Sequence, residues 1–318
     1  MLGIVEPMDT TTYDAAIIGG GAAGLSAALV LGRTRRRVVV VDGGAPRNAP
    51  AAHMQGFLSR DGMPPADLLR LGREEAEAYA VEFIQGRAAS IEPGFVVGLA
   101  NGDRLEARRL LIAAGATDEL PRLAGVEERW GRDFLHCPYC HGWEVRDQPL
   151  GVLATGVGSV EHAELIHQWS TDLVFFTHTY ELTGDERVRL AALGIRVVEG
   201  KVRMLLVEHD RLRGVALADG SVIDRSAVFI RPSMRPNASA LVEQLGCEVD
   251  DLGFVRVDGT GGTSVRGVWA AGNVANPRAQ VITAAGEGSA AAIAINADLV
   301  QEDVRDALDA RRFGRRRP

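Results

Sequence analysis

The sequence predicts an α/β protein with two Rossmann-like βαβ domains of the nucleotide-binding type. Three observations lead to this prediction. A glycine-rich turn near the N-terminus joins a buried-strand pattern to a helical pattern. The same order of strand, glycine turn and helix returns in the middle of the chain. The length of 318 residues is typical of about two domains.

Composition narrows the class of protein. Apolar residues make up 46% and charged residues 24% of the chain, which is ordinary for a globular protein. The net charge of −7 argues against general nucleic-acid binding. No apolar run approaches the roughly 20 residues of a membrane helix, and the N-terminus does not resemble a signal peptide. Because only 3 cysteines are present, a structural disulfide framework is excluded, and we expect a cytoplasmic protein.

The first unit begins with a predicted strand at Tyr13–Ile18, followed by a glycine turn and a helix over Leu25–Leu31. The glycines let the backbone approach a pyrophosphate, and the helix N-terminus offers N–H groups to it. A second predicted strand, Arg37–Val41, ends at Asp42, whose carboxylate is placed to accept hydrogen bonds from a ribose. These features favour dinucleotide binding over a merely glycine-rich βα turn. The turn contains Gly19, Gly21 and Gly24.

The next segments complete this unit. Residues 43–62 predict a loop, and Pro64–Ala80 predicts a helix with leucines on one face. Short strands are expected at 83–88, 95–99 and 105–107, and an apolar strand over 109–116 ends in a glycine turn. Residues 115–125 then predict a crossover, in which Pro121 excludes a continuous helix.

Chemistry is concentrated in the stretch His136-Cys137-Pro138-Tyr139-Cys140-His141-Gly142. Two thiols at Cys-x-x-Cys spacing can close and reopen a disulfide, and flanking histidines can move protons near neutral pH. Three other interpretations compete. A structural zinc site needs about four ligands, and Cys247 offers no clustered partner, so we expect no metal. Cys-x-x-Cys-His is also a c-type haem attachment string, and an inert buried pair is the third alternative.

The pattern then restarts. A strand over 149–154 is followed by a glycine turn and helix at 155–163 and by a strand at 173–177. In this second turn a valine separates Gly156 from Gly158, and alanine replaces the third glycine. The following Thr177-His178-Thr179 lacks an arginine to bind a 2′-phosphate, so the sequence predicts the right architecture with a doubtful NADPH site.

The remainder continues in the same style. Strands are expected at 196–198, 204–208, 214–217 and 228–231, and the segment 255–258 leads to an apolar strand that ends at Gly272 and Asn273. A small-residue helix is predicted over Ser289–Leu299. The basic tail at 311–318 is typical of a solvated end.

Taken in order, these motifs resemble the low-molecular-weight thioredoxin reductases over residues 13–300. The shared motifs are the first glycine turn, Ala-Ala-Gly-Ala at 113–116, Cys-x-x-Cys, the altered second turn, Gly-Val-Trp-Ala-Ala-Gly-Asn at 267–273 and Ala-Ala-Gly-Glu-Gly at 284–288. The resemblance implies a homodimer and one FAD domain, 13–116 with 241–300. Inserted in it would be an NAD(P)-binding-like domain, 117–240, which carries the cysteines. Residues 1–12 and 301–318 would be terminal extensions.

The resemblance also implies roles for single residues. Cys137 and Cys140 match the redox pair, the second lying against the flavin and the first meeting the substrate. Asn273 stands where the family has aspartate. The residues expected at FAD are Gly19, Gly21, Ala22, Ala23, Gly24, Asp42, Gly43, Arg47, Asn48, Ala88, Ala114, Gly115, Gly272, Asn273, Gln280 and Val281.

Two departures from the family set the expected activity. The family has Cys-Asp-Gly where this chain has Cys140-His141-Gly142, and it has His-Arg-Arg where this chain has Thr177-His178-Thr179. Both departures resemble the FAD-dependent dithiol oxidases that close disulfides in natural products such as gliotoxin and holomycin. We therefore expect a small dithiol substrate, with dioxygen as electron acceptor and His136 or His141 as acid and base.

Two alternatives remain open. In the first, NADPH, ferredoxin or another donor reduces FAD, which then reduces a thioredoxin-like protein. In the second, the chain is a flavin-binding redox sensor or partner-binding protein without turnover. Spacing does not decide which histidine takes the proton.

Overall fold

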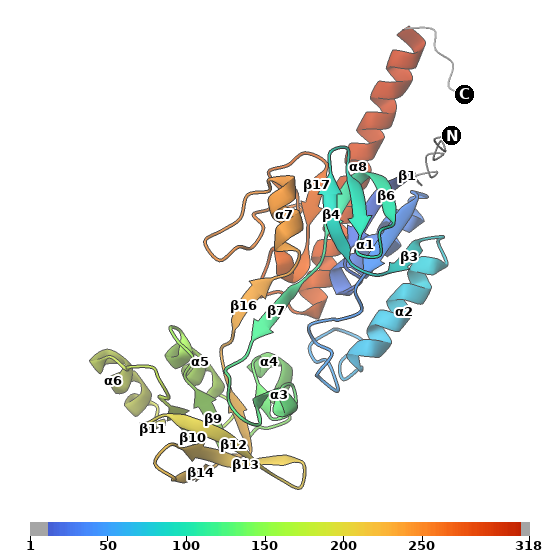
Figure 1. Ribbon diagram of the computed structural model, residues 1–318. Helices are drawn as coiled ribbons and strands as arrows, with labels where there is room; N and C mark the ends of the chain where they lie inside the picture. Colours follow the sequence, from blue (N-terminus) through green and yellow to red (C-terminus); the bar gives the residue numbers. More distant parts are fainter. Residues whose placement is uncertain (1–11, 313–318) are drawn as a thin grey trace, which may run out of the picture. The chain divides into compact units, whose positions relative to one another are not determined.

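The computed structural model describes residues 12–312, which divide into two compact units (Figure 1). The first unit contains the chain up to Arg47, Ala66–Thr117, and the chain from Arg235 onward. The second contains Asn48–Pro65 and Asp118–Met234. The expected leader before Thr12 and the tail after Arg312 lie outside the described residues.

The first unit is built on a sheet with strand order β3-β2-β1-β6-β5-β4, in which β17 also pairs with β6. Pairing is parallel through β3, β2, β1, β6 and β17, whereas β5 and β4 add an antiparallel edge. Continuous apolar runs such as Val38–Val41 suit these strands, because both faces of the parallel part are buried. The strands are β1 (Thr12–Ile18), β2 (Val38–Asp42), β3 (Glu82–Gln85), β4 (Ala88–Glu92), β5 (Val96–Leu99), β6 (Arg104–Ile112) and β17 (Val268–Ala270).

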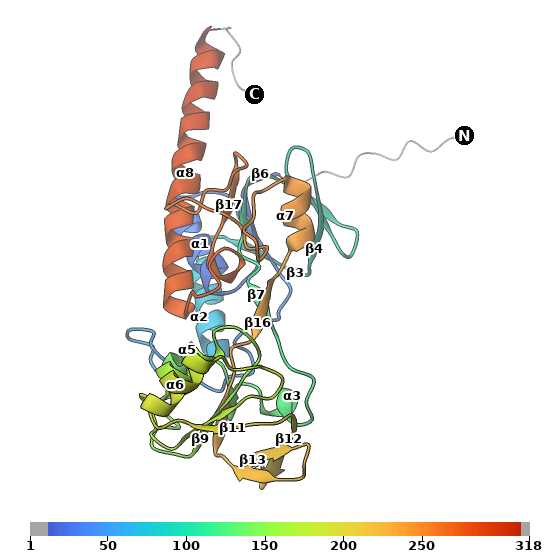
Figure 2. The same ribbon diagram turned by 90° about the vertical axis from the view of Figure 1, so that its left-hand side faces the viewer.

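Helices cover both faces of this sheet. On one face, α1 (Ala22–Arg33) and α8 (Val281–Arg312) bury Leu31 and Ile295 in one core; on the other, α7 (Ser239–Leu245) buries Leu241 in a second core. Figure 2 shows α8 running along α1 and on past the sheet. Two further elements are α2 (Pro65–Glu77) and the 3₁₀ turn η1 (Gly272–Val274).

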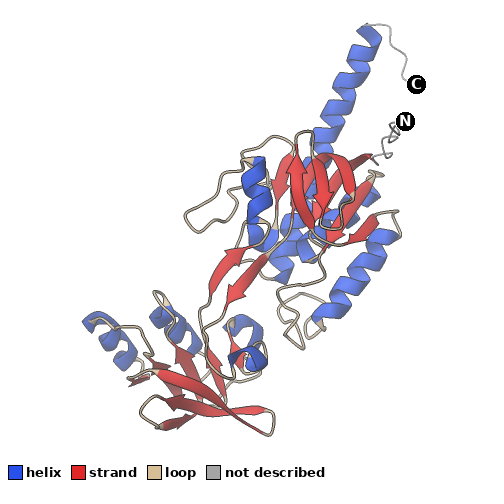
Figure 3. Ribbon diagram, viewed as in Figure 1, coloured by secondary structure: helices blue, strands red, loops and turns tan. Residues whose placement is uncertain are grey.

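The second unit has a parallel sheet of order β11-β10-β9-β15-β8 and an antiparallel sheet of order β12-β13-β14 (Figure 3). Its strands are β8 (Phe134–Leu135), β9 (Leu150–Leu153), β10 (Leu173–Phe176), β11 (Arg196–Val198), β12 (Val202–Glu208), β13 (Arg211–Leu217), β14 (Val222–Asp224) and β15 (Ala227–Phe229). Its helices are α3 (Val126–Arg129), α4 (Pro138–His141), α5 (Ser159–Ile166) and α6 (Gly184–Ala192). The chain passes between the units along β7 (Ala116–Glu119) and β16 (Ser233–Pro236), which pair with each other.

The structure differs from the sequence prediction at several elements, among them β7, which lies in the predicted crossover at 115–125, and α6, which was not predicted. β6 is one strand, although separate strands were expected at 105–107 and 109–116. Helix α8 begins and ends well outside the expected Ser289–Leu299, so 301–312, expected as part of a terminal extension, continues this helix. Ion pairs join these two elements. Arg108 bonds Glu302 at 2.9 Å and Asp303 at 2.7 Å, and Arg109 bonds Asp298 at 2.6 Å, so charged strand residues hold charged helix residues.

Within residues 12–312, no helix is both long and apolar enough to cross a membrane.

Candidate active site

The first glycine turn is shaped by close backbone contacts. A Cβ on Gly24 would lie 1.9 Å from the carbonyl oxygen of Gly19, and Gly19 has a φ of +114° that L side chains rarely adopt. Next to Gly21, in contrast, nothing lies within 4 Å of an added Cβ. The glycines therefore bring strand and helix together and leave open space beside the turn.

The N-terminus of α1 is suited to an anion. Its N-cap, Gly21, provides no side-chain cap, and no acidic residue lies in the first turn. The first helical hydrogen bond runs from the amide of Leu25 to the carbonyl of Gly21 at 2.9 Å. The N–H groups before Leu25 therefore have no partner within the helix and lie at the positive end of its dipole. Dinucleotide-binding sites use such helix ends for the diphosphate.

Asp42, at the end of β2, lies directly beside this turn. Its Oδ1 accepts hydrogen bonds from the amides of Gly20 and Gly44, both at 3.2 Å. Asp42 is therefore oriented by the backbone of the glycine turn, and its ribose-binding role stays a prediction.

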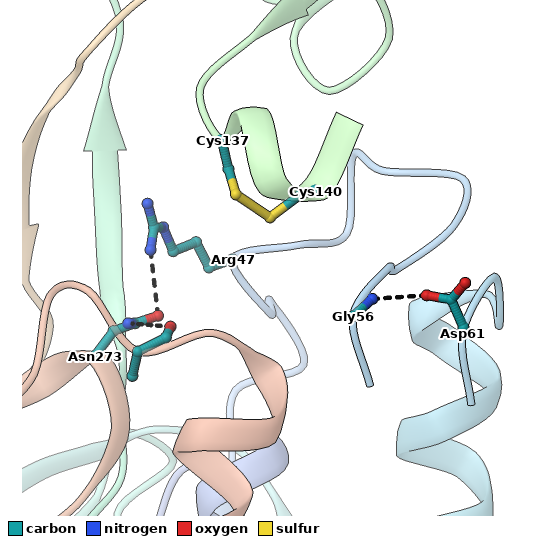
Figure 4. Close-up of a disulfide and its surroundings, with 7 residues drawn as sticks. Arg47, Gly56, Asp61, Cys137, Cys140 and Asn273 are labelled. Atoms are coloured by element: carbon teal, nitrogen blue, oxygen red, sulfur yellow. Dashed lines mark hydrogen bonds between the residues drawn. A yellow bond between two sulfur atoms is a disulfide. The ribbon is translucent and has the colours of Figure 1, made fainter. Parts of the chain in front are cut away.

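A third strand end meets the same place. Gly272, after β17, has a φ of +74°, and a Cβ there would lie 3.1 Å from that of Ala23 in α1. The next residue, Asn273, accepts a hydrogen bond from Arg47 Nη1 at 3.3 Å (Figure 4). The structure therefore gathers Gly19–Gly24, Asp42, Arg47, Gly272 and Asn273 at the carboxyl ends of the parallel strands.

Glu287 fixes this third strand end, although sequence reasoning gave it no role. Its carboxylate accepts the amide of Gly272 at 2.9 Å and Asn276 Nδ2 at 2.6 Å. Glu287 belongs to the Ala-Ala-Gly-Glu-Gly motif at 284–288, but no local pattern indicates which backbone atoms its carboxylate binds.

The remaining predicted cofactor residues are more dispersed. Ala114 and Gly115 follow β6, where Asn237 holds both carbonyls at 2.9 Å. Gln280 and Val281 lie at the start of α8, and Ala88 begins the edge strand β4. Gly43 faces the side chain of Arg87, with an added Cβ 3.5 Å away. Asn48 belongs to the second unit, whereas all the others lie in the first.

The cysteine motif lies in the second unit. Cys137 and Cys140 form a disulfide with a Cα–Cα distance of 5.2 Å (Figure 4). Cys137 is the N-cap of the short helix α4, in which Pro138 occupies an early position. The amides of Cys140 and His141 donate to the Cys137 carbonyl at 3.1 and 3.2 Å, so one helical turn brings the sulfurs together.

His141 is at i+4 from Cys137, a spacing that puts both side chains on one side of a helical turn. Burial lowers the pKa of His141 below its usual 6.5. Its buried Nδ1 has no hydrogen-bond partner among residues 12–312. The lowered pKa favours the neutral imidazole of His141, whose Nδ1 is a buried nitrogen without a hydrogen-bond partner in the described part of the chain.

A second histidine pair lies behind the motif. The rings of His136 and His162 are 6.1 Å apart. Burial lowers the pKa of His162 to about 4, with His136 and Arg231 adding to the effect. His162 is thus neutral at neutral pH. It was missed because its buried side of α5 is set by tertiary packing against Phe229 rather than by a local motif.

The second glycine turn, before α5, is closed by its own side chains. Ser159 Oγ accepts the amides of Thr155 and Gly156 at 3.1 and 3.3 Å. A Cβ on Gly158 would lie only 1.7 Å from Arg231 Nη1, so the guanidinium covers this glycine. Beyond β10, His178 Nδ1 accepts the amide of Val202 at 3.0 Å. In this chain the stretch Thr177-His178-Thr179, where the family has His-Arg-Arg, therefore holds the start of β12.

Comparisons with known proteins agree with this architecture. Residues 13–288 match the family model described as pyridine nucleotide-disulphide oxidoreductase, and the chain belongs to this family. It is 32% identical to "Thioredoxin reductase sirT" of Leptosphaeria maculans, over 92% of this chain and 96% of that protein. It is also 29% identical to a thioredoxin reductase of Mycolicibacterium smegmatis, over 92% of this chain and 98% of that protein.

Solved structures extend the likeness. The crystal structure of HlmI is 54% identical with a TM-score of 0.93, covering 98% of this chain and 99% of that chain. A putative thioredoxin reductase TrxB from Bacillus anthracis is 34% identical with a TM-score of 0.87, covering 92% and 99%. The chain is thus a thioredoxin reductase-like disulfide oxidoreductase, and its cofactor is FAD.

The first unit fits FAD. The open space beside Gly21, the uncapped N-terminus of α1 and the oriented carboxylate of Asp42 are complementary to a diphosphate and a ribose.

Proposed function

We propose that the protein is an FAD-dependent dithiol oxidase, which forms a disulfide in a small dithiol and passes the electrons to dioxygen. The closed second glycine turn carries the proposal. The amides of Thr155 and Gly156 are bonded to Ser159, and Gly158 is covered by Arg231, so part of the turn that would meet a nicotinamide dinucleotide is already engaged. A dithiol oxidase receives its electrons from the substrate and needs no such donor.

The disulfide supplies the chemistry. A substrate thiolate attacks Cys137 Sγ, the Cys137–Cys140 bond breaks, and Cys140 leaves as a thiolate. The second substrate thiol, once deprotonated, attacks the substrate sulfur of the mixed disulfide. This releases the oxidised product and leaves both cysteines reduced. Two electrons and two protons thus pass from substrate to protein. FAD, when bound, supplies the two-electron acceptor that restores the disulfide, and dioxygen is the final acceptor, becoming hydrogen peroxide.

His141 is the proposed base for the substrate thiols. It lies at helical spacing from Cys137, and its lowered pKa keeps it neutral, with Nδ1 able to take a proton. His136 precedes Cys137 and contacts the ring of His162, so we assign it the support of the motif rather than proton transfer.

The reductase direction is the alternative, in which NADPH or ferredoxin supplies electrons for a thioredoxin-like partner. Gly156 and Gly158 favour it, because they keep part of a dinucleotide-binding turn. The hydrogen bonds of Ser159 and the position of Arg231 oppose it.

We further propose a cytoplasmic homodimer. Ile293, Val300, Val304 and Leu308 are exposed at roughly helical spacing along α8, which gives an apolar stripe for a second copy.

The test is aerobic turnover of dithiothreitol, without any nicotinamide, followed by oxygen uptake and peroxide formation. We expect wild-type protein to consume oxygen, and we expect Cys137→Ser and Cys140→Ser each to abolish uptake, because each lacks one sulfur of the relay. Cys247→Ser is the matched control, since this buried thiol lies in the first unit, apart from the motif in sequence, and should leave uptake unchanged.

Undiminished oxygen uptake in either relay variant would show that electrons reach oxygen without the disulfide. No uptake by the wild-type protein with dithiothreitol or with other small dithiols would favour a redox sensor without turnover.

A further inference from the structure

We propose that His162 is a positioning residue for the redox pair, which it fixes through the peptide group that joins His136 to Cys137. This role rests on the proposed redox function of the Cys137–Cys140 pair, and it applies to the oxidase and the reductase directions alike. His162 lies on α5 with 8% of its surface exposed, and its ring is 6.1 Å from that of His136. It therefore lies directly behind the residue at which the chain enters the cysteine motif.

Two strands end side by side at this place. β8 and β15 are parallel neighbours, and Phe229 pairs with Leu135 in their register. The amide of Ile230 donates to the carbonyl of Leu135 at 2.8 Å, so Ile230 and His136 are level with each other just past the two strands. A side chain that reaches both residues can therefore hold the two strand ends together.

His162 makes hydrogen bonds to the backbone of both residues, His136 and Ile230. Burial lowers the pKa of His162, whereas each of these two bonds raises it, as a bond does when a ring N–H donates to an acceptor. The acceptor that a residue's backbone offers is its carbonyl oxygen. The carbonyl of His136 belongs to the peptide group that continues into Cys137, so His162 restrains the backbone at which the first cysteine begins.

The ring holds this position without a charge. The titratable and charged side chains that act on His162 are His136, from the end of β8, and Arg231, from the end of β15, and both disfavour a second positive charge. Together with burial they lower the pKa of His162 to about 4. The neutral ring, and with it the restraint on the motif, is therefore present at neutral pH.

An unpaired nitrogen of His162 separates this role from simple filling of the core. Its Nε2 is buried and has no hydrogen-bond partner among residues 12–312. The ring also packs edge-on against Phe229, with 6.4 Å between centroids, so a phenylalanine would fill a similar space without a buried polar atom. A buried, unpaired polar group costs about 1–3 kcal/mol. The histidine is accounted for by the hydrogen bonds that it makes to the backbone of the motif.

A restrained Cys137 favours the closed disulfide. Closure is intramolecular, so its equilibrium constant rises with the fraction of time in which the two sulfurs are held in bonding geometry. Without the hydrogen bond to the carbonyl of His136, the backbone before Cys137 samples more orientations. We therefore expect loss of the ring N–H to lower the equilibrium constant for closing the Cys137–Cys140 bond.

The experiment measures this closure constant in the FAD-loaded holoenzyme, equilibrated without oxygen in buffers of reduced and oxidised glutathione. In the exchange, two cysteine thiols become the disulfide, and one oxidised glutathione becomes two reduced glutathione molecules. A hydrogen bond contributes about 0.5–1.5 kcal/mol, so His162→Phe should lower the closure constant about 2- to 10-fold. His162→Gln, whose amide can still donate to a carbonyl, should stay closer to the wild-type value than His162→Phe.

His167→Phe is the matched control, because it removes a histidine from the end of the same helix, and it should leave the closure constant unchanged. Stability separates positioning from a purely structural role. His162→Phe should unfold at the same or a higher denaturant concentration than wild type, because it removes the unpaired nitrogen. A lower unfolding midpoint with an unchanged closure constant would instead assign His162 to the core alone.

An unchanged closure constant in His162→Phe would overturn the proposal, as would an equal fall in His167→Phe or in His162→Gln. If the phenylalanine variant does not fold, His162→Leu replaces it, with the same contradicting results. Neither a dithiol substrate nor dioxygen takes part in this equilibrium. Failed dithiol turnover would therefore count against the oxidase proposal alone, and an unchanged closure constant against the role of His162 alone.

Discussion

At the scale of single residues, the two histidines that flank the cysteines differ in a way that spacing alone did not decide. His141 has a lowered pKa and an unpartnered buried Nδ1 among residues 12–312. His136 lies against the ring of His162. The sequence showed both histidines beside the cysteines, but burial distinguishes them, and burial depends on packing from elements distant in the chain.

The pH dependence of dithiol oxidation tests the role of His141. Because burial lowers its pKa from 6.5, the neutral, proton-accepting form persists below pH 6.5 and is lost only as pH falls through the lowered value. Turnover should therefore show an acid limb below pH 6.5. His141→Ala should lower the rate about 100-fold, the lower range for loss of a general base, and remove that limb.

His136→Ala is the comparison, which should keep the limb. The measurement is the rate of flavin reduction by dithiol between pH 5 and pH 8. An acid limb that is unchanged in His141→Ala would assign the proton transfer to another group.

At the scale of elements, the backbones of α1 and α8 approach closely because Gly288 of α8 has no side chain. A Cβ on Gly288 would lie 2.0 Å from the carbonyl oxygen of Ala23. We expect Gly288→Ala to destabilise the protein by about 1–3 kcal/mol, because the backbones must separate in a packed core. The measurement is the midpoint of denaturant unfolding with FAD bound.

The control lies two residues earlier on α8. Nothing lies within 4 Å of a Cβ added to Gly286, so Gly286→Ala should be neutral or stabilise the helix by up to about 1 kcal/mol. Equal changes in stability for the two substitutions would mean that helix propensity, and not the close packing of α8 against α1, determines the effect of alanine at Gly288.

Elements were predictable where local patterns coincide with packing. The first glycine turn follows β1 and precedes α1 as expected, because strand, glycine turn and helix are encoded within one short stretch. The full length of α8 was not predicted, because its C-terminal half is polar. Its acids Asp298, Glu302 and Asp303 pair with arginines of β6, and such long-range pairs leave no periodic signal in the sequence.

Site residues, like the elements, were predictable where a local pattern marks them and not where distant segments meet. Asp42 was predicted from its distance along the chain, and it lies beside the glycine turn. Glu287, Asn237 and His162 were not predicted, because each acts through backbone or ring contacts that only the fold brings together. The hydrogen bond between Arg47 and Asn273 joins residues 226 positions apart, so no local sequence pattern predicts it.

At the scale of the whole molecule, the two units carry different parts of the chemistry. The first contains the groups complementary to FAD, and the second contains the disulfide and the closed second turn. The family uses a nicotinamide donor in its reductases, so the source of electrons is what separates the two proposed directions. The altered second turn predicts that the electrons come from a dithiol.

The most direct measurement follows the flavin absorbance band anaerobically after mixing with either excess dithiothreitol or excess NADPH. We predict that the dithiol bleaches the band rapidly, that NADPH leaves it unchanged, and that admission of air restores it with formation of hydrogen peroxide. Rapid bleaching by NADPH, with little or none by the dithiol, would contradict the account and establish the reductase direction.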